Sequence, residues 1–132
     1  MLEKIFCVDD DAITLMLCKK VIERVSFAKE ILTATNGEEA ILYFKELANQ
    51  SNPSYPQLIL LDLNMPIMNG WEFLDQYLES GYHEIFVEAK FIVLSSTIDP
   101  QDVEKTKSYP MVIDFLSKPI TKEMMEELKK TL

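Results

Sequence analysis

The sequence has no long hydrophobic run, and it contains little histidine, cysteine or glycine. None of its apolar runs approaches the roughly 20 residues that a helix needs to cross a bilayer. Residues 1–4 lead directly into a strand pattern and lack the basic and apolar regions of a signal peptide. We therefore expect a cytoplasmic protein that does not bind the membrane. Its 132 residues fit a single domain over 1–132 and leave little room for a second.

Acidic side chains outnumber basic ones. Lysine and arginine total 13 against 22 aspartates and glutamates, which gives a net charge of −9. This charge argues against direct nucleic-acid binding but leaves protein partners open. Cys7 and Cys18 each lie in an apolar run, which favours buried, reduced thiols over a disulfide or a redox pair. No Cys/His cluster indicates zinc. The single His83 lies in a polar stretch, where we expect it to be exposed, and it has no obvious partner.

Short apolar runs and helical patterns alternate five times along the chain. Strands are predicted at residues 4–8, 31–34, 58–61, 91–94 and 112–116. Helices are predicted at residues 12–25, from 36 to 47, from 69 to 78, from 100 to 108, and from 121 on. The last helix is expected to turn the following side chains toward the core: Met124, Met125, Leu128 and Leu132. Residues 49–57 must form a loop, whereas residues 80–90 either extend the third helix or form a long loop.

Three helix starts carry capping signals. Residues 36–39 and 69–72 each begin with asparagine and have glutamate three residues later, as in a capping box. Asp99 precedes Pro100, which places proline at the first helical position. Strands that are apolar along their whole length, alternating with helices, indicate an α/β protein with a parallel sheet covered on both faces. In such sheets, ligands bind at the carboxyl ends of the strands.

Polar side chains follow four of the five predicted strands. Asp9 and Asp10 follow the first, Asp62 the third and Ser95 the fourth, and Lys118 comes soon after the fifth. A parallel sheet brings all five side chains to one edge. Three carboxylates in close proximity repel one another unless a cation lies between them. Oxygen ligands without imidazole or thiolate favour Mg²⁺.

A carboxylate beside a metal, a lysine and a hydroxyl is suited to phosphoryl transfer. Aspartate can attack phosphorus to give an aspartyl phosphate, and the cations neutralise charge on the transferring oxygens. Asp62 is the expected nucleophile because it stands alone after the central strand. Each residue also has a plainer interpretation: Asp11 can cap the first helix, Ser95 can be a turn serine and Lys118 an exposed charge. Their joint position at one end of consecutive strands favours the functional interpretation.

In these residues the chain resembles the receiver domain of bacterial response regulators, of the chemotaxis-regulator type, and the resemblance covers nearly all of it. The segments that carry the resemblance are Val8-Asp9-Asp10-Asp11, Leu61-Asp62-Leu63-Asn64-Met65-Pro66 with Asn69-Gly70, Leu94-Ser95-Ser96, and Phe115-Leu116-Ser117-Lys118-Pro119-Ile120. It implies a flavodoxin-like, doubly wound sheet of five parallel strands in the order 2-1-3-4-5, with five helices. It also implies that Asp62 is the phosphoacceptor and that Asp9 and Asp10 hold Mg²⁺. Asp10 and Asp62 would be direct ligands, and Asn64 would contribute its backbone carbonyl.

The resemblance extends to the residues that respond to phosphorylation. It implies that Ser95 is the switch hydroxyl, that Lys118 contacts the phosphoryl group and that Phe115 reorients on activation. Ser95 replaces the more usual threonine, and Phe115 lacks the hydroxyl of a tyrosine, so any switch there must be steric. The peptide bond between Lys118 and Pro119 is expected to be cis. Tyr109 either contacts a partner or packs the loop before the fifth strand, and the sequence favours neither.

These features predict a phosphoacceptor of a two-component phosphorelay, and not an enzyme acting on a separate substrate. A sensor histidine kinase or a histidine phosphotransfer protein would supply the phosphoryl group, and the domain would catalyse its own phosphorylation and dephosphorylation. The chain ends soon after the last helix, so we expect a stand-alone receiver that docks to an unknown downstream protein. The sequence leaves open whether phosphorylation produces a homodimer.

Two other classes of protein compete with this interpretation. The first is an interaction module whose acidic site is vestigial, which failure to bind Mg²⁺ would favour. The second is a phosphatase of the haloacid dehalogenase type, in which Asp9 would be the nucleophile. That class needs a threonine where Ile13 stands, and a cap domain that 132 residues cannot hold.

Overall fold

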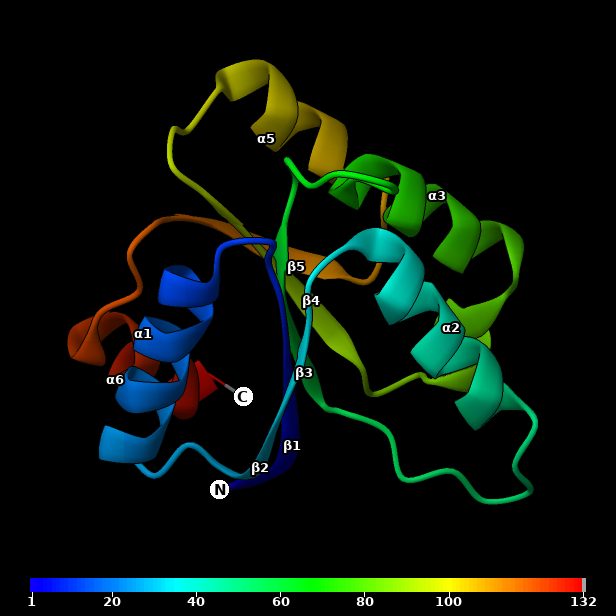
Figure 1. Ribbon diagram of the computed structural model, residues 1–132, viewed down its shortest axis with the longest axis horizontal. Helices are drawn as coiled ribbons and strands as arrows, with labels where there is room; N and C mark the ends of the chain where they lie inside the picture. The colour runs from blue at the N-terminus through cyan, green and yellow to red at the C-terminus, as the bar shows by residue number, and fades with distance from the viewer. Residues whose placement is uncertain (132) are drawn as a thin grey trace.

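The computed structural model describes residues 1–131 as one parallel five-stranded sheet with helices on both faces (Figure 1). The strand order is β2-β1-β3-β4-β5 and every neighbouring pair is parallel, as predicted. The strands are β1 (Leu2–Val8), β2 (Ala28–Ala34), β3 (Leu58–Asp62), β4 (Lys90–Ser95) and β5 (Val112–Ser117). The helices are α1 (Ala12–Arg24), α2 (Gly37–Ala48), α3 (Gly70–Glu79), α4 (Tyr82–Ile85), α5 (Pro100–Thr106) and α6 (Lys122–Thr131).

The sheet divides the hydrophobic core into two parts. In Figure 1, α1 and α6 cover one face, and α2 and α3 cover the other. Every residue of β3 is buried, which explains why its sequence is apolar up to Asp62. The core beneath α2 and α3 is rich in aromatic side chains, and the ring of Phe44 lies 5.1 Å from that of Tyr77 and 6.2 Å from that of Phe73. The strands are therefore packed on both faces, and they carry the site residues at their carboxyl ends.

The predicted helix starts are largely confirmed. Asn69 and Glu72 form a complete capping box, and the Asp99 side chain accepts a hydrogen bond from the backbone N–H of Gln101. Asn36 caps α2 by accepting from the N–H of Glu39 at 2.9 Å. The Glu39 side chain, however, accepts from the backbone N–H of Thr35 and not from that of Asn36, so the second half of the predicted capping box is wrong.

The predicted count of five helices is wrong by one. Residues 80–90 neither extend α3 nor form a plain loop, because α3 ends at Glu79 and the chain turns at Gly81, whose φ of 73° is left-handed. The single turn of α4 follows, and Phe86 after it is buried against Tyr55 of the loop at 49–57, with 5.1 Å between the rings. The two segments thus pack on one another. A hydrophobic pattern cannot predict so short a helix, because one turn has no measurable period.

Several smaller predictions can also be compared with the structure. Cys7 and Cys18 are buried and free, and the Lys118–Pro119 peptide bond is cis, as expected. His83 is half-buried and not exposed. In α6, the side chains of Met125 and Leu128 are buried and Met124 is half-buried, whereas Leu132 lies outside the described residues.

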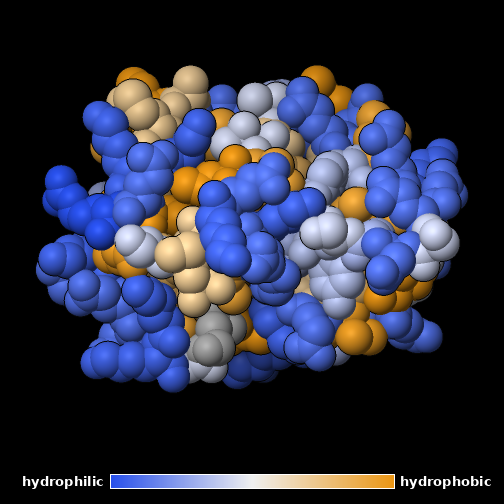
Figure 2. Space-filling model, turned by 90° about the horizontal axis from the view of Figure 1, so that it is seen from below, coloured by the Kyte–Doolittle hydropathy of each residue, from blue (hydrophilic) through white to orange (hydrophobic). Residues whose placement is uncertain are grey.

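The two edges of the sheet differ in character. The face at the amino ends of the strands, seen from below in Figure 2, is mainly hydrophilic with separate apolar patches. The opposite edge carries the carboxyl ends of the strands and the acidic residues. Among residues 1–131, no helix is both long enough and apolar enough to cross a membrane.

Candidate functional site

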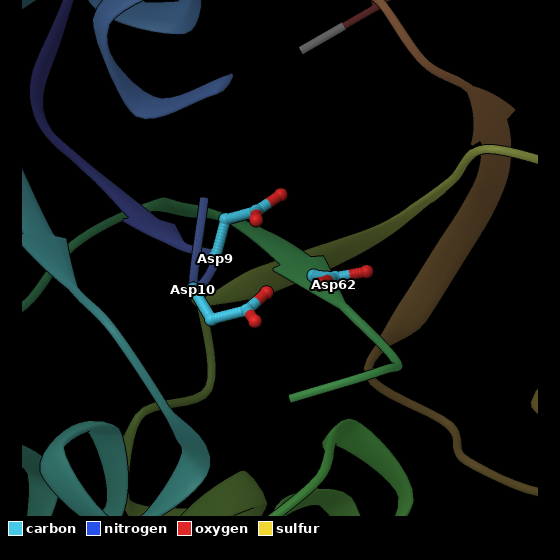
Figure 3. A group of neighbouring side chains, drawn as sticks. All are labelled: Asp9, Asp10 and Asp62. Carbon is cyan, nitrogen blue, oxygen red and sulfur yellow. The ribbon is translucent and has the colours of Figure 1, made fainter. Parts of the chain in front are cut away.

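Three carboxylates meet at the carboxyl edge of the sheet. Asp9 and Asp10 directly follow β1, and Asp62 is the last residue of the neighbouring strand β3. Figure 3 shows the three side chains grouped at these strand ends, and one oxygen of each lies within 4.8 Å of one oxygen of the others. Asp9 and Asp62 are buried, and Asp10 is exposed. The convergence predicted from the sequence is therefore present.

Lys118 is the cation of this site. Its Nζ lies 2.5 Å from Asp9 Oδ2 and 3.3 Å from Asp62 Oδ1. The backbone N–H of Lys118 donates to the carbonyl of Ser95 at 2.8 Å, which holds the lysine at the end of β5 beside β4. One ammonium thus faces two buried carboxylates and a third nearby, so the site carries excess negative charge.

The charges of the site shift its pKa values. Burial raises the pKa of Asp62, the Asp9 carboxylate raises it further, and Lys118 opposes both without cancelling them. Burial acts to lower the pKa of Lys118, but its contacts with Asp9 and Asp62 outweigh burial and raise the pKa. The lysine is therefore firmly charged, whereas ionised Asp62 is incompletely compensated.

An open cavity of about 740 Å³ gives solvent access to these residues. Besides the acidic residues and Lys118, it is lined by Asn64, Ser96, Thr14 and Leu17, among others. Sequence reasoning missed Thr14 and Leu17, which α1 brings to the site, although their helical spacing from Asp10 and Asp11 was a usable signal. Ser96 lines the cavity, but Ser95 does not.

Ser95 lies at the end of β4 with its side chain turned to its own loop. The residue is buried, and its hydroxyl accepts from the backbone N–H of Thr97 at 3.4 Å, a long and weak contact. The hydroxyl predicted to bind the phosphoryl group is thus next to the site but not part of the cavity wall. Such a weakly held side chain can change rotamer at little cost.

Phe115 and Tyr109 were predicted to form the switch or partner surface. Phe115 is half-buried on β5, paired with Val93 of β4. Tyr109 is buried, and its hydroxyl donates to Asp75 at 2.5 Å. Tyr109 is thus packed inside the protein with an internal partner in this conformation, and its contact with another protein stays a prediction.

The acidic cluster fits a divalent cation. Among residues 1–131, the three grouped aspartates supply only carboxylate oxygens, with no histidine or cysteine among them, which is the donor set of Mg²⁺. Asn64 is exposed beside them, and its backbone N–H lies 3.4 Å from Asp62 Oδ1. The raised pKa of Asp62 also indicates a site with capacity for further positive charge.

The strand order and the acidic edge define the class of the protein: a flavodoxin-like α/β domain of the chemotaxis-regulator type with its site beside β1 and β3. The profile of the response regulator receiver domain family matches residues 5–130. The chain therefore belongs to this family, whose members act in two-component signalling.

Individual similar proteins point to the same family. The chain is 30% identical over 128 residues to a probable methanogenesis regulatory protein, FilR2, of Methanothrix harundinacea, covering 97% of this chain and 77% of that protein. It is 26% identical to a probable C4-dicarboxylate response regulator, DctR, of Halalkalibacterium halodurans, covering 93% of this chain but 48% of that protein. It thus spans only about half the length of the second relative. The crystal structure of a two-component response regulator from Cytophaga hutchinsonii superposes with a TM-score of 0.87 at 29% identity, covering 98% of this chain and 96% of that one.

Proposed function

We propose that this domain is a Mg²⁺-dependent phosphoacceptor of a cytoplasmic phosphorelay, with Asp62 as the residue that becomes phosphorylated. The phosphoryl donor would be the phosphohistidine of a sensor histidine kinase or of a histidine phosphotransfer protein. The observation that carries the proposal is the position of Asp62: it lies at the end of the central strand, lines an open cavity, and has the Lys118 ammonium within 3.3 Å, which also contacts Asp9.

The chemistry follows from these residues. An oxygen of Asp62 attacks phosphorus, a new O–P bond forms, and the N–P bond of the donor breaks, with its electron pair leaving on the imidazole nitrogen. Asp62 attacks as the carboxylate, the form that Lys118 favours from 3.3 Å, although burial and Asp9 raise its pKa. Lys118 neutralises charge on the transferring oxygens as the transition state forms. Its position within 3.3 Å of Asp62 suits this task.

The cation would be held by four groups: the carboxylates of Asp9, Asp10 and Asp62 and the backbone carbonyl of Asn64. When bound, Mg²⁺ supplies positive charge to the phosphoryl oxygens that Lys118 alone does not provide. Asp9 also accepts a hydrogen bond from the backbone N–H of Asp11 at 2.9 Å, which fixes its orientation before any cation arrives. The acidic residues are thus already placed for binding.

The new negative charge would then act on Ser95. Its hydroxyl would leave the weak contact with Thr97 and donate to the phosphoryl group, and half-buried Phe115 would move into the space released. This would bias the surface formed by α5, β5 and α6 toward a second arrangement that a downstream protein recognises.

The phosphoryl donor would dock on α1 beside the cavity. Three apolar side chains of this helix are exposed: Ile13 by 64%, Met16 by 47% and Leu17 by 44%, and Leu17 also lines the cavity. An apolar helix face on the donor would cover them and bring its phosphohistidine over Asp62. We expect Ile13→Asp to slow phosphoryl transfer from a phosphohistidine protein about tenfold or more, while leaving acetyl phosphate reactivity unchanged. Equal slowing with both donors would contradict docking at this face.

The proposal is tested by intact mass after incubation with acetyl phosphate and Mg²⁺. One added phosphoryl group is expected on the wild type, and none on Asp62→Asn or after EDTA treatment. An adduct that persists in Asp62→Asn but disappears in Asp9→Asn would instead favour a phosphatase-type nucleophile. No adduct together with no Mg²⁺ binding in a titration would favour the second candidate, an interaction module with a vestigial site.

A further inference from the structure

Four side chains join α3 to the segment from α5 to β5. The hydroxyl of Tyr109 donates to Asp75 Oδ1 at 2.5 Å, and its ring lies 5.9 Å from that of Trp71. Lys105 Nζ lies 4.3 Å from the centre of the Trp71 ring, within cation–π range. Tyr109 is buried by this arrangement, and Trp71 is half-buried. We name these four residues the α3–α5 contact.

Apart from this contact, α5 is weakly attached to the rest of the protein. It has seven residues, and Thr106 is the only one that is buried. The segment that leads from β4 to α5, residues 96–99, is exposed throughout. In Figure 1, α5 lies above the carboxyl edge of the sheet with one end beside α3. A short helix with one buried side chain is held only weakly by hydrophobic burial. The α3–α5 contact therefore supplies much of what attaches α5 to the rest of the protein.

In contrast, α3 is fixed to the end of β3. The backbone N–H of Gly70 donates to the carbonyl of Leu63 at 2.9 Å. A Cβ at Gly70 would lie 2.5 Å from the backbone oxygen of Asp62, so the first turn of α3 touches the phosphoacceptor itself. Helix α3 therefore keeps a fixed position relative to Asp62.

The two ends of α5 are thus attached to different parts of the site. Its N-terminal end follows Ser95 through the exposed residues 96–99, and its C-terminal end is held to α3 through Tyr109 and Lys105. We propose that the α3–α5 contact holds α5 in its unphosphorylated position, so that it opposes the movement of α5 when the Ser95 loop shifts toward the phosphoryl group. This inference concerns regulation of the site and rests on the proposed function.

The proposal makes the hydroxyl of Tyr109 a determinant of how readily the domain switches. The hydrogen bond to Asp75 stabilises only the arrangement in which α5 lies beside α3. A ligand that favours the other arrangement must therefore overcome that bond. Removing the bond, without removing the ring that packs on Trp71, lowers the free-energy cost of reaching the second arrangement. The apparent affinity for a phosphoryl analogue therefore increases.

The test uses Tyr109→Phe and beryllofluoride, a phosphoryl analogue formed from beryllium and fluoride ions, titrated with Mg²⁺ present. Trp71 is the only tryptophan of the sequence, so its fluorescence reports directly on this contact. We expect Tyr109→Phe to reach half-saturation at a concentration about fivefold lower than the wild type, the effect of one lost hydrogen bond. Asp75→Ala should shift the midpoint similarly, and the double variant should show no further shift.

Tyr55→Phe is the matched control. Its hydroxyl also takes part in one hydrogen bond, accepting from the backbone N–H of Glu88 at 3.3 Å, but in the 49–57 loop, away from α5. It should keep the wild-type midpoint, and an equal shift in this control would overturn the proposal by showing general loosening. A wild-type midpoint in Tyr109→Phe, with acetyl phosphate still labelling Asp62, would overturn the contact's role while the proposed function stands. If the wild type binds no analogue and gains no phosphoryl group, both fail together.

Discussion

Asp62 combines two properties that conflict in the absence of a cation. It must be ionised to attack phosphorus, yet burial and the neighbouring Asp9 carboxylate raise its pKa and disfavour the ionised form. Lys118 offsets part of this cost from 3.3 Å. The site therefore stores unfavourable electrostatic free energy in the folded domain, as is common at functional sites.

This conflict predicts that Asp62→Asn stabilises the protein when Mg²⁺ is removed. Where the folded-state pKa of a carboxyl is raised, the folded protein binds more protons than the unfolded chain between the two pKa values. Stability then falls as the pH rises through that window, and the loss is complete above the folded-state pKa. Asparagine avoids the loss. Urea unfolding in EDTA should show a higher free energy of unfolding for Asp62→Asn at neutral pH.

The gain should shrink as the pH falls below the ordinary carboxyl range, where Asp62 is protonated in both states. Glu126→Gln, on the exposed side of α6, is the matched control and should have no comparable effect. A less stable Asp62→Asn at neutral pH would mean that the attraction of Lys118 exceeds the cost of burial.

Tyr77 presents a different residue-scale problem. Its side chain is fully buried among aromatic rings, and within residues 1–131 its hydroxyl has no hydrogen-bond partner. An unpaired buried hydroxyl costs about 1–3 kcal/mol. Tyr77→Phe should therefore raise the free energy of unfolding by about 1 kcal/mol, measured by urea denaturation. Tyr109→Phe, which deletes a hydroxyl bonded to Asp75, should lower it by about 1 kcal/mol, and a loss of stability in both variants would refute the distinction.

The residues of the site were more predictable than their contacts. Asp9, Asp10, Asp62 and Lys118 were found because each follows an apolar strand, and a parallel sheet must bring such residues to one edge. The side-chain direction of Ser95 was not predictable, because a rotamer depends on neighbours that sequence spacing does not place. The partner of Tyr109 could not be predicted from the sequence either, since Asp75 lies 34 residues away on another helix.

At the scale of elements, two helices begin so close to the β3–α3 loop that only glycine fits. A Cβ at Gly37 would lie 2.7 Å from the backbone oxygen of Met68, and one at Gly70 would lie 2.5 Å from that of Asp62. The backbone N–H of Gly37 also donates to Met68 at 2.8 Å. Both helices are therefore positioned by the same loop that leaves the phosphoacceptor.

Gly70→Ala should consequently disturb the site as well as the fold. The added methyl group forces α3 away from the end of β3, which should cost about 1–3 kcal/mol of stability and slow phosphorylation by acetyl phosphate. Gly81→Ala is the informative comparison, because nothing lies within 4 Å of its added Cβ and only its φ of 73° is unfavourable. It should cost about 1 kcal/mol through backbone strain alone and leave the labelling rate unchanged. Equal labelling rates in the two variants would show that α3 does not position Asp62.

The elements were predictable to the extent that their sequences are periodic or continuously apolar. All five strands and the five longer helices were predicted at nearly their observed positions. The alternation of strands and helices predicted a parallel sheet, whereas the order of its strands came from the resemblance to receiver domains. The strand β2 extends three residues further toward the N-terminus than predicted, because pairing with β1 continues there: Ala28 lies opposite Leu2, and Glu30 lies opposite Lys4. Helix α4 was missed because its four residues give no measurable period, and the packing of the following Phe86 on Tyr55 is a tertiary contact that the local sequence does not reveal.

At the scale of the whole molecule, the net charge of −9 is unevenly placed, with three aspartates gathered at one edge of the sheet. Self-repulsion within such a cluster opposes folding, and a bound cation relieves it. General screening by salt also relieves repulsion between exposed charges, so the two effects must be separated by experiment.

Mg²⁺ should stabilise the folded domain through the acidic site specifically. Binding to the folded state alone adds about 2.7 kcal/mol at a concentration one hundred times the dissociation constant. Melting measured at constant ionic strength should thus show a rise in Tm with Mg²⁺ for the wild type and little or none for Asp10→Asn. Asp10 is the appropriate position because its side chain is exposed, so the substitution removes a ligand without disturbing packing. An equal rise in both proteins would mean that Mg²⁺ acts by screening the net charge. The acidic residues would then not form a specific metal site.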